Sequence, residues 1–311
     1  MRFLKVQKQM AQEAITEGKR QGWMDRTHRV AHEGDFVLIP LRPGHDPPGE
    51  VVEREVEEEA RERPRPFRSS FDVVGDIAIV KVRDVERARE IASSILASNS
   101  HVSAVFHDAG ISGTERRRRL SFLAGSYHTL TEHRENGIRL FVDVEKVYFS
   151  PRLATERMRV CNRVADGERV LDMFAGIGPF SITIARYRRC SVTAVDINSD
   201  AIGLMRRNIE ANRLLGRVEP VLGDAREVVA GRGPFDSVIM NLPHSPDEFL
   251  DVGLSVLREG GKVFYYRICD LDTLYLTMER FREAGCQILE KRKVHGYSPR
   301  EDMYHILARK G

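Results

Sequence analysis

Cysteine is scarce in this sequence, and the few cysteines are widely spaced. Four occur in 311 residues, at positions 161, 190, 269 and 286, and none belongs to a C-x-x-C pair. Structural zinc sites and the disulfide frameworks of small secreted domains both depend on closely spaced cysteines. We therefore expect no metal site and no disulfides, and we expect the protein to work in the reducing cytoplasm.

Long hydrophobic runs are also missing. No apolar segment approaches the ~18 residues that a membrane-spanning helix requires. The first residues, M-R-F-L-K-V-Q-K, lack the apolar stretch of a secretory signal. We therefore expect no membrane partner.

The sequence also lacks a strong excess of one charge. The sequence has 49 basic and 46 acidic residues, a formal net charge of +3. Bulk charge therefore does not predict a nucleic-acid-binding protein, and any RNA-binding surface must come from local clusters. With 41% hydrophobic and 31% charged residues, the composition is that of a globular protein, expected to be a monomer.

The chain is long enough for two or three domains. A helical pattern over Gln7–Lys19 and strand-like segments at Thr27–Ala31 and Phe36–Leu41 predict a small α/β domain over residues 1–49. Residues 50–66 are almost wholly charged and end at prolines, which predicts a linker.

A second small α/β domain is expected over residues 67–149. It contains the densest basic cluster of the sequence, Arg116–Arg119, and the dipeptide Asn136-Gly137, a strong hairpin signal between two alternating segments. Asp84 precedes a helical pattern and is expected to cap it. The expected elements are strands at Phe71–Val82, Val102–Phe106, Tyr127–His133 and Ile138–Val144 and a helix at Val85–Ala97.

Residues 150–311 predict the catalytic domain, because strands and helices alternate there. Ser150 and Pro151 are expected to cap and to begin its first helix. Such alternation predicts a mostly parallel sheet with helices on both faces, and the last two strands fit an antiparallel edge. The expected strands are Val170–Asp172, Val192–Asp196, Val218–Leu222, Phe235–Met240, Gly261–Tyr266, Gln287–Lys293 and Met303–Ala308.

The segment Val170–Phe180, V-L-D-M-F-A-G-I-G-P-F, organises this domain. A buried strand, a turn with Gly176 and Gly178, and a helix start follow one another, as in nucleotide-binding sites. A glycine has no Cβ, so the backbone can approach a ligand closely. The third glycine of the dinucleotide-binding pattern is absent, since Phe180 and Ser181 occupy its place.

Polar residues follow the next three strands. Asp196 comes 24 residues after Asp172, near the usual spacing of a carboxylate that binds ribose hydroxyls. Asp224 follows the third strand, where it would bind an adenine amino group, and Asn241-Leu242-Pro243 follows the fourth. Ligands of open α/β sheets bind at these carboxyl ends. Taken singly, each of these residues could equally cap a helix or close a turn; together they predict one shared ligand.

The glycine pattern and these acids resemble those of class I S-adenosylmethionine-dependent methyltransferases, in which the cofactor is S-adenosylmethionine. The segment Asp143–Arg157, D-V-E-K-V-Y-F-S-P-R-L-A-T-E-R, together with Asn241-Leu-Pro and the basic segment that ends at Leu123–Gly125, resembles archaeal tRNA (guanine-37-N1)-methyltransferases over nearly the whole chain. The resemblance implies a Rossmann-like, mostly parallel seven-stranded sheet with two smaller N-terminal α/β domains. It also implies that the first domain contacts the tRNA body, away from the anticodon loop.

The resemblance further implies the roles of individual residues. The catalytic carboxylate falls on Glu156, Asn241 assists it, and the helper arginine falls in the basic cluster, at Arg118 or Arg116. Tyr148 and Pro243 are expected to contact the target base. Cofactor contacts are expected from Arg157, Asp172, Phe174, Gly176, Gly178, Asp196, Ile197, Asp224, Ala225 and Asn241.

Two rivals stay open at this point. One is the wybutosine-pathway aminocarboxypropyl transferase, which shares the scaffold and the cofactor but moves another group from the same sulfur. The other is a non-catalytic RNA-binding protein that retains the cofactor fold. Methylation of a wybutosine intermediate in addition to guanine also stays open.

Overall fold

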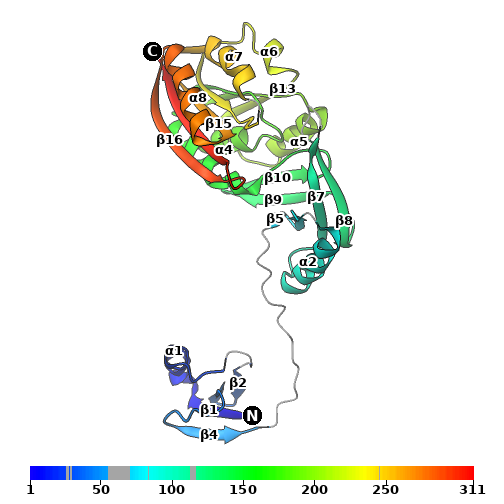
Figure 1. Ribbon diagram of the computed structural model, residues 1–311, viewed down its shortest axis with the longest axis vertical. Coiled ribbons are helices and arrows are strands. Elements are labelled where there is room, and N and C mark those ends of the chain that lie inside the picture. Colours follow the sequence, from blue (N-terminus) through cyan, green and yellow to red (C-terminus); the bar gives the residue numbers. More distant parts are fainter. Residues whose placement is uncertain (26–27, 29, 55–70, 83, 113–116, 245) are drawn as a thin grey trace. The chain divides into compact units, whose positions relative to one another are not determined.

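The computed structural model describes residues 1–25, 28, 30–54, 71–82, 84–112, 117–244 and 246–311, and for residues 111, 112, 117 and 118 it describes the backbone alone. The chain divides into two compact units, Met1–Arg63 and Pro64–Gly311 (Figure 1). Of the expected linker, residues 50–66, residues 55–66 fall outside the described residues.

The first unit is an antiparallel sheet with a helix packed on it. The sheet order is β2-β3-β1-β4. Its core consists of residues such as Leu4, Trp23 and Ile39. The elements are β1 (Arg2–Gln7), α1 (Ala11–Gln21), β2 (Ala31–Glu33), β3 (Phe36–Pro40) and β4 (Glu50–Glu53).

Two strands of this unit differ from the sequence analysis. The strand β1 was not predicted, although its burial partly alternates. Residues 50–53, assigned to the linker, form β4, in which Val51 and Val52 pair with Leu4 and Phe3 of β1. These two valines are half-buried, so they add apolar contacts that the surrounding charges conceal in the sequence.

The second unit begins with a four-stranded sheet, called here the middle sheet, in the order β5-β6-β7-β8. The single strand expected at Phe71–Val82 is a hairpin, because Gly75 turns the chain with φ +56°. Asp84 caps α2 as predicted, accepting the N–H groups of Glu86 and Arg87. The elements are β5 (Phe71–Val74), β6 (Ile77–Val80), α2 (Val85–Ser98), β7 (Ala104–Ser112) and β8 (Arg117–Gly125).

A hairpin of β9 (Leu130–Glu135) and β10 (Ile138–Asp143) follows, turning at Asn136 and Gly137 with positive φ angles as predicted. Its outer strand β10 has no strand partner beyond it. Helix α5 (Ser199–Glu210) and the turn after it take that place. The Asn208 side chain accepts from Phe141 N–H at 2.6 Å and donates to Phe141 C=O at 3.2 Å. Asn212 repeats the pattern with Arg139, at 2.9 and 2.7 Å.

The catalytic domain contains a seven-stranded sheet in the order β13-β12-β11-β14-β15-β17-β16. The first five strands are parallel, and β17 is antiparallel to both of its neighbours, so the predicted fold is confirmed. The strands are β11 (Arg169–Asp172), β12 (Ser191–Asp196), β13 (Arg217–Leu222), β14 (Phe235–Met240), β15 (Leu257–Cys269), β16 (Cys286–Gly296) and β17 (Asp302–Lys310). The other helices are η2 (Pro151–Leu153), α3 (Ala154–Arg163), α4 (Pro179–Tyr187), α6 (Ala225–Val228), η3 (Pro246–Phe249), α7 (Leu250–Ser255) and α8 (Leu271–Glu283).

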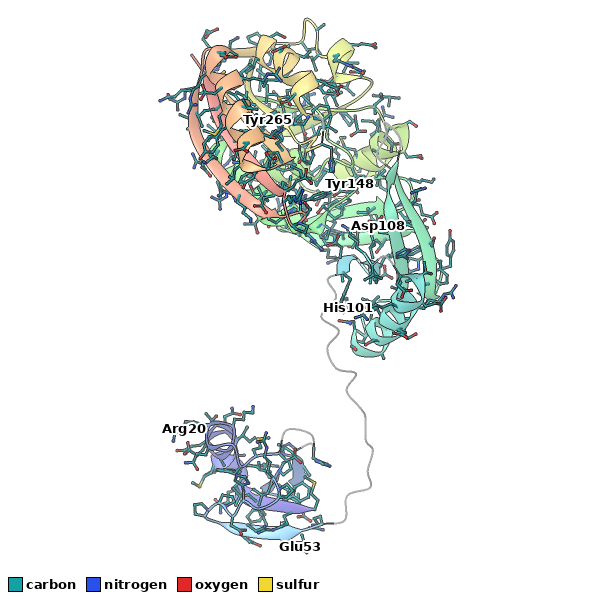
Figure 2. The ribbon with its side chains drawn as sticks, in the orientation of Figure 1. Arg20, Glu53, His101, Asp108, Tyr148 and Tyr265 are labelled. Carbon is teal, nitrogen blue, oxygen red and sulfur yellow. The ribbon has the colours of Figure 1, made fainter. Side chains whose placement is uncertain are left out.

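One apolar core joins the middle sheet, the hairpin and the catalytic domain. It contains Ile77 and Phe106 of the middle sheet, Leu140 of the hairpin, and Ile177 and Ile182 beside the glycine turn. Asp108 of β7 and Tyr148 therefore both lie where the middle sheet meets the catalytic domain (Figure 2).

The four cysteines are buried and unpaired. Among the described residues, no helix is both long and apolar enough to cross a membrane.

Candidate active site

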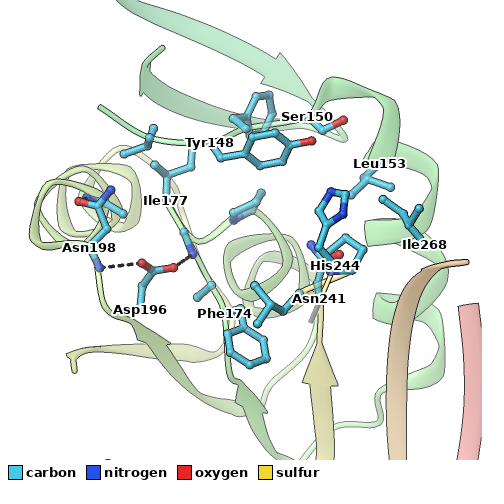
Figure 3. A pocket seen from close by; sticks show the side chains of 18 of the residues that line it. Tyr148, Ser150, Leu153, Phe174, Ile177, Asp196, Asn198, Asn241, His244 and Ile268 are labelled. Carbon is cyan, nitrogen blue, oxygen red and sulfur yellow. Dashed lines mark hydrogen bonds between the residues drawn. The ribbon is translucent and has the colours of Figure 1, made fainter. Parts of the chain in front are cut away.

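A cavity of about 1390 Å³ opens at the carboxyl ends of β11, β12, β13 and β14 (Figure 3). Asp196, Asp224 and Asn241, each at the end of a different strand, line it together, as the sequence analysis expected. The opposite wall comes from the segment around Tyr148. Further lining residues that no motif indicated are Lys81, His107, Asp108, Arg152, Asn198, His244, Phe249, His295 and Tyr297.

The two glycines of the turn have different surroundings. Gly176 has φ +55°. Among the described atoms, a Cβ built on it would have a single neighbour within 4 Å, the carbonyl oxygen of Tyr148 at 3.9 Å. Gly176 lines the cavity, so it leaves room for a ligand. Gly178 caps α4 with φ +83°, and a Cβ there would lie 2.7 Å from Cγ of Met205. Gly178 therefore lets the turn pack closely on α5, and its expected cofactor contact stays a prediction.

Asp196 supports the glycine turn. Its Oδ2 accepts the Gly176 N–H at 2.7 Å and its Oδ1 accepts the Asn198 N–H at 2.9 Å (Figure 3). Asn198 in turn caps α5 and donates to Lys146 C=O at 2.9 Å. The carboxylate is thus fixed between the turn and the segment that leads to Tyr148.

Asp172 lies beneath the cavity, fully buried, and does not line it. Its Oδ2 accepts the Ser181 hydroxyl at 2.7 Å, while its Oδ1 is buried without a hydrogen-bond partner in the described structure. Burial raises the pKa of Asp172 to about 7; Asp196 adds to the shift and Ser181 opposes it. Asp172 therefore supports the turn from below, and its expected contact to the cofactor stays a prediction.

Asp172→Asn should change how stability depends on pH. The unfolded carboxyl loses its proton near pH 4 and the folded one near pH 7, so the folded state binds more protons between these values. The free energy of unfolding of the wild type should then fall across this window as pH rises, by up to about 1.4 kcal/mol per pH unit from this group. Denaturant unfolding at several pH values should show a smaller fall for the variant. Equal slopes would mean that Asp172 is ionised in the fold.

The adenine end of the expected cofactor site lies at β13. Asp224 caps α6 and forms an ion pair with Arg226, whose Nη2 lies 2.5 Å from Oδ2 of Asp224. The hydrogen bond from Arg226 lowers the pKa of Asp224, so this carboxylate is ionised and able to accept. Phe174 packs edge-on against Phe249, with ring centroids 4.8 Å apart, and the other expected contacts, Ile197 and Ala225, also line the cavity.

Asn241 presents a buried polar atom to the cavity. Its Oδ1 is buried without a hydrogen-bond partner in the described structure, and the residue lines the cavity. A buried acceptor left unpaired costs about 1–3 kcal/mol. Pro243, His244 and Ile268 continue the same wall, and the carbonyl of Pro243 accepts the Ile268 N–H at 2.9 Å. The site therefore offers an acceptor to a ligand that has an N–H or O–H group.

Arg152 connects the cavity to the middle sheet. Its Nε donates to Oδ1 of buried Asp72 at 2.6 Å, and Lys81 Nζ lies 3.2 Å from the other oxygen. Arg152 lies on η2, where Ser150 occupies the cap position and Pro151 is the first helical residue, as predicted; the Ser150 side chain makes no cap bond. Two cations therefore face the cavity from the side of the middle sheet.

Arg157 differs from its expected role. It is 1% exposed, and its Nη2 donates to Glu135 at 2.7 Å and to Ser150 C=O at 2.9 Å. Its guanidinium also lies over the rings of Phe149 and Phe180. Arg157 reaches the cavity wall, but its hydrogen bonds join the hairpin to α3.

Glu156 is 3% exposed and is not among the residues that line the cavity. Its Oε2 accepts a hydrogen bond from Nη2 of Arg292 on β16. The expected catalytic carboxylate is therefore ion-paired beneath the cavity in this structure. Leu153, three residues earlier, does line the cavity, so Glu156 lies within one helical turn of it.

The expected helper arginines are only partly described. Arg116 lies outside the described residues, and of Arg118 only the backbone is described, paired with Ile111. That pairing places it next to Gly110, which lines the cavity. The backbone of Arg118 therefore lies near one residue of the cavity wall.

The residues present fit S-adenosylmethionine. Asp196 and Asp224 can accept from ribose hydroxyls and an adenine amino group, Gly176 leaves space for a ligand, and Phe174 offers an aromatic surface. In the described ranges of the chain, no group of three or more acidic, histidine or cysteine side chains could hold a metal ion.

Two family models match the chain. The TRM5/TYW2 methyltransferase domain matches residues 131–293, and the TYW2 N-terminal domain matches residues 49–129. The chain is 41% identical to the tRNA (guanine(37)-N(1))-methyltransferase Trm5b of Pyrococcus abyssi, over 90% of each chain. It is 36% identical to Trm5b of Methanocaldococcus jannaschii, over 92% of this chain and 90% of the relative. A solved structure described as the complex of aTrm5 and tRNALeu matches with a TM-score of 0.82 and 33% identity, over 99% of both chains.

The fold is that of a class I methyltransferase. This follows from the order of the strands in the sheet, the glycine turn and the acidic residues at the ends of the strands. The chain belongs to the TRM5/TYW2 methyltransferase family, and the resemblance stated from its sequence is confirmed.

Proposed function

We propose that this enzyme transfers a methyl group from S-adenosylmethionine to N1 of the guanine at position 37 of tRNA. The unpartnered Oδ1 of Asn241 is the observation that carries this proposal. A guanine presents N–H donors along its pairing edge, and a buried acceptor in the cavity can take one of them. Trm5b relatives that match 90% or more of this chain support the position and the atom.

The cofactor would be held by the strand ends. Asp196 would bind the ribose hydroxyls, Asp224 the adenine amino group, and the Gly176 backbone would pass close to the ligand. When bound, S-adenosylmethionine supplies an electrophilic methyl group on a sulfonium sulfur. Asn241 and Pro243 would hold the target base so that N1 faces this group, and positioning of this kind lowers the barrier directly.

Guanine N1 is a poor nucleophile while it carries a proton, so a base must remove it. Glu156 is the proposed base, since a positioned carboxylate contributes about 10²–10⁴-fold by such proton transfer. The carboxylate lies one helical turn from the cavity and accepts a hydrogen bond from Arg292 in this structure. Hydrogen bonds of catalytic groups often form fully only with substrate in place.

Negative charge develops on guanine O6 as N1 loses its proton. An arginine directed at O6 would stabilise it, and Arg118, then Arg116, are the proposed residues. The paired backbone of Arg118 beside Gly110 supports this choice. Tyr148, on the wall opposite Asn241, is a surface for a base that has left the anticodon-loop stack.

The domains would have different roles in binding tRNA. The first domain would contact the tRNA body, while the middle sheet and the catalytic domain, which share one core, would act on the anticodon loop.

Removing residues 1–63 should leave the rest of the protein folded, because the two units are separate clusters of contacts. We expect thermal unfolding and S-adenosylmethionine affinity close to those of the full chain. Affinity for whole tRNA should fall by about tenfold or more, as expected when one of two linked contacts is lost. Calorimetry and filter binding measure the two effects. Loss of cofactor binding would place the boundary elsewhere.

One assay separates the candidate reactions. Purified protein is incubated with unmodified tRNA and S-adenosylmethionine labelled in the methyl group or, separately, in the aminocarboxypropyl chain. Nucleoside analysis should give 1-methylguanosine at position 37 with the methyl label alone. Incorporation of the other label would support the aminocarboxypropyl reaction, and no incorporation would support an RNA-binding role.

A further inference from the structure

Arg292 is the residue that holds Glu156, and the sequence analysis did not select it. Its Nη2 donates to Oε2 of Glu156, while Nε of Arg159 lies 3.9 Å from Oε1. Arg292 comes from β16, 136 residues later in the chain. Glu156 is 3% exposed. Among the described residues, the cation nearest to its carboxylate is Arg292, which lies on a strand far away in the sequence.

The pair lies one strand step beneath the cavity. Ile268 and Met303 pair across β15 and β17, and both line the cavity. Two residues further along the same strands, Tyr266 of β15 pairs with His305 of β17. His305 pairs in turn with Arg292 of β16, the strand on the other side of β17. The guanidinium thus lies at the level of Tyr266 and His305, directly below the cavity floor.

Polar atoms at this level have unused hydrogen-bonding capacity. The Tyr266 hydroxyl and both ring nitrogens of His305 are buried without hydrogen-bond partners in the described structure. Neither can supply a positive charge to Glu156, because burial, reinforced by Arg292, Arg159 and Arg163, lowers the pKa of His305 to about 3. Burial, and then Glu156, raises the pKa of Tyr266 well above its ordinary value, so it stays a neutral phenol.

We propose that Arg292 is a positioning residue, which holds the Glu156 carboxylate beneath the base-binding cavity and places a positive charge beside it. This inference rests on the proposed function, in which Glu156 takes the N1 proton. A buried carboxyl without a cation keeps its proton to higher pH, and a protonated carboxyl cannot act as a base. Arginine suits the task because its guanidinium stays charged at every working pH.

The charged and titratable groups that face Glu156 come from four elements. They are Arg157, Arg159 and Arg163 of α3, Tyr266 of β15, Glu290 and Arg292 of β16, and His305 of β17. His305 and Tyr266 do not change charge in the pH range of an assay. Glu290 is paired with Arg163 at 2.7 Å and with Arg292 at 3.4 Å, at the more exposed side of the cluster. The pH dependence of proton removal should therefore follow Glu156 and its contact to Arg292.

Single-turnover methyl transfer to unmodified tRNA, measured against pH with saturating cofactor, tests the inference. Arg292→Gln should move the half-maximal rate about one pH unit higher, so the rate should fall by up to about tenfold on the acid side of the profile and by less above it. Arg292→Lys keeps a cation and should recover most of both changes.

Arg163→Gln is the matched control: it removes an ion pair to Glu290 but no contact to Glu156, so its profile should match the wild type. An unmoved midpoint in folded Arg292→Gln, or an equal loss at every pH, would overturn the inference.

A double variant separates this inference from the proposed function. In a Glu156→Gln background, Arg292→Gln should cause no further loss of rate, because the group that it positions is gone. A further loss of similar size would show that Arg292 acts elsewhere. If Glu156→Gln alone transfers methyl groups at the wild-type rate, the base assignment fails, and the inference with it. If Glu156→Gln is impaired and the Arg292→Gln profile is normal, only the inference fails. Should Arg292→Gln not fold, Arg292→Met, which also removes the cation, must show the same shift of the midpoint.

Discussion

Glu156→Gln should reduce the single-turnover rate of methyl transfer by about 10²-fold or more, while tRNA and cofactor still bind. The glutamine keeps the shape of the side chain and can still accept from Arg292, but it cannot take a proton from N1. General-base catalysis contributes about 10²–10⁴-fold, which sets the expected loss. Rapid-quench assays with saturating tRNA and cofactor measure the chemical step directly.

Loss of stability must be separated from loss of chemistry, because Glu156 is buried in an ion pair. Glu168→Gln is a suitable control. Glu168 is also a largely buried carboxylate, paired with Lys262 at 2.7 Å, and it lies outside the cavity lining. Both variants should melt at lower temperature, but only Glu156→Gln should be slow per folded molecule. Near-wild-type transfer in folded Glu156→Gln would remove this carboxylate from the mechanism.

Asp196→Ala should weaken S-adenosylmethionine binding by about 10- to 100-fold. A hydrogen bond to a charged group contributes about 1.5–3 kcal/mol, and each 1.4 kcal/mol is tenfold in affinity. The structure adds a second reason: the variant also leaves the Gly176 and Asn198 N–H groups without their acceptor, which loosens the turn. Isothermal titration calorimetry measures the affinity.

Asp200→Ala provides the comparison for this result. Asp200 stands four residues later, in the first turn of α5, and does not line the cavity. Its replacement should leave cofactor affinity unchanged. If Asp196→Ala bound the cofactor as tightly as Asp200→Ala, the carboxylate would serve the turn alone.

Local signals in the sequence predicted much of the fold. The positive φ angles of Asn136 and Gly137, the capping bonds of Asp84 and the strand–turn–helix at Gly176 all follow from a few neighbouring residues, and each was predicted. Asp196, Asp224 and Asn241 meet at one cavity because parallel strands end at one edge of a sheet.

Contacts between distant residues were not predictable in this way. Arg157 pairs with Glu135 and Glu156 with Arg292, 22 and 136 residues apart, and nothing near either residue in the sequence indicates its partner. Gly178 looked like a ligand contact because spacing does not show that Met205 fills the space beside it. The strand β4 was hidden because its two valines stand among charged residues.

Asn208 of α5 and Asn212 of the turn after it have a consequence for the solubility of the protein. An edge strand with open N–H and C=O groups is a template on which another chain can add a strand and begin to aggregate. Asn208 and Asn212 each supply one acceptor and one donor to β10, so their side-chain amides imitate a neighbouring strand. Asn208 also donates to Ile177 C=O at 3.1 Å, inside the glycine turn. The amide that closes this edge against other chains thus also fixes the loop on which catalysis depends.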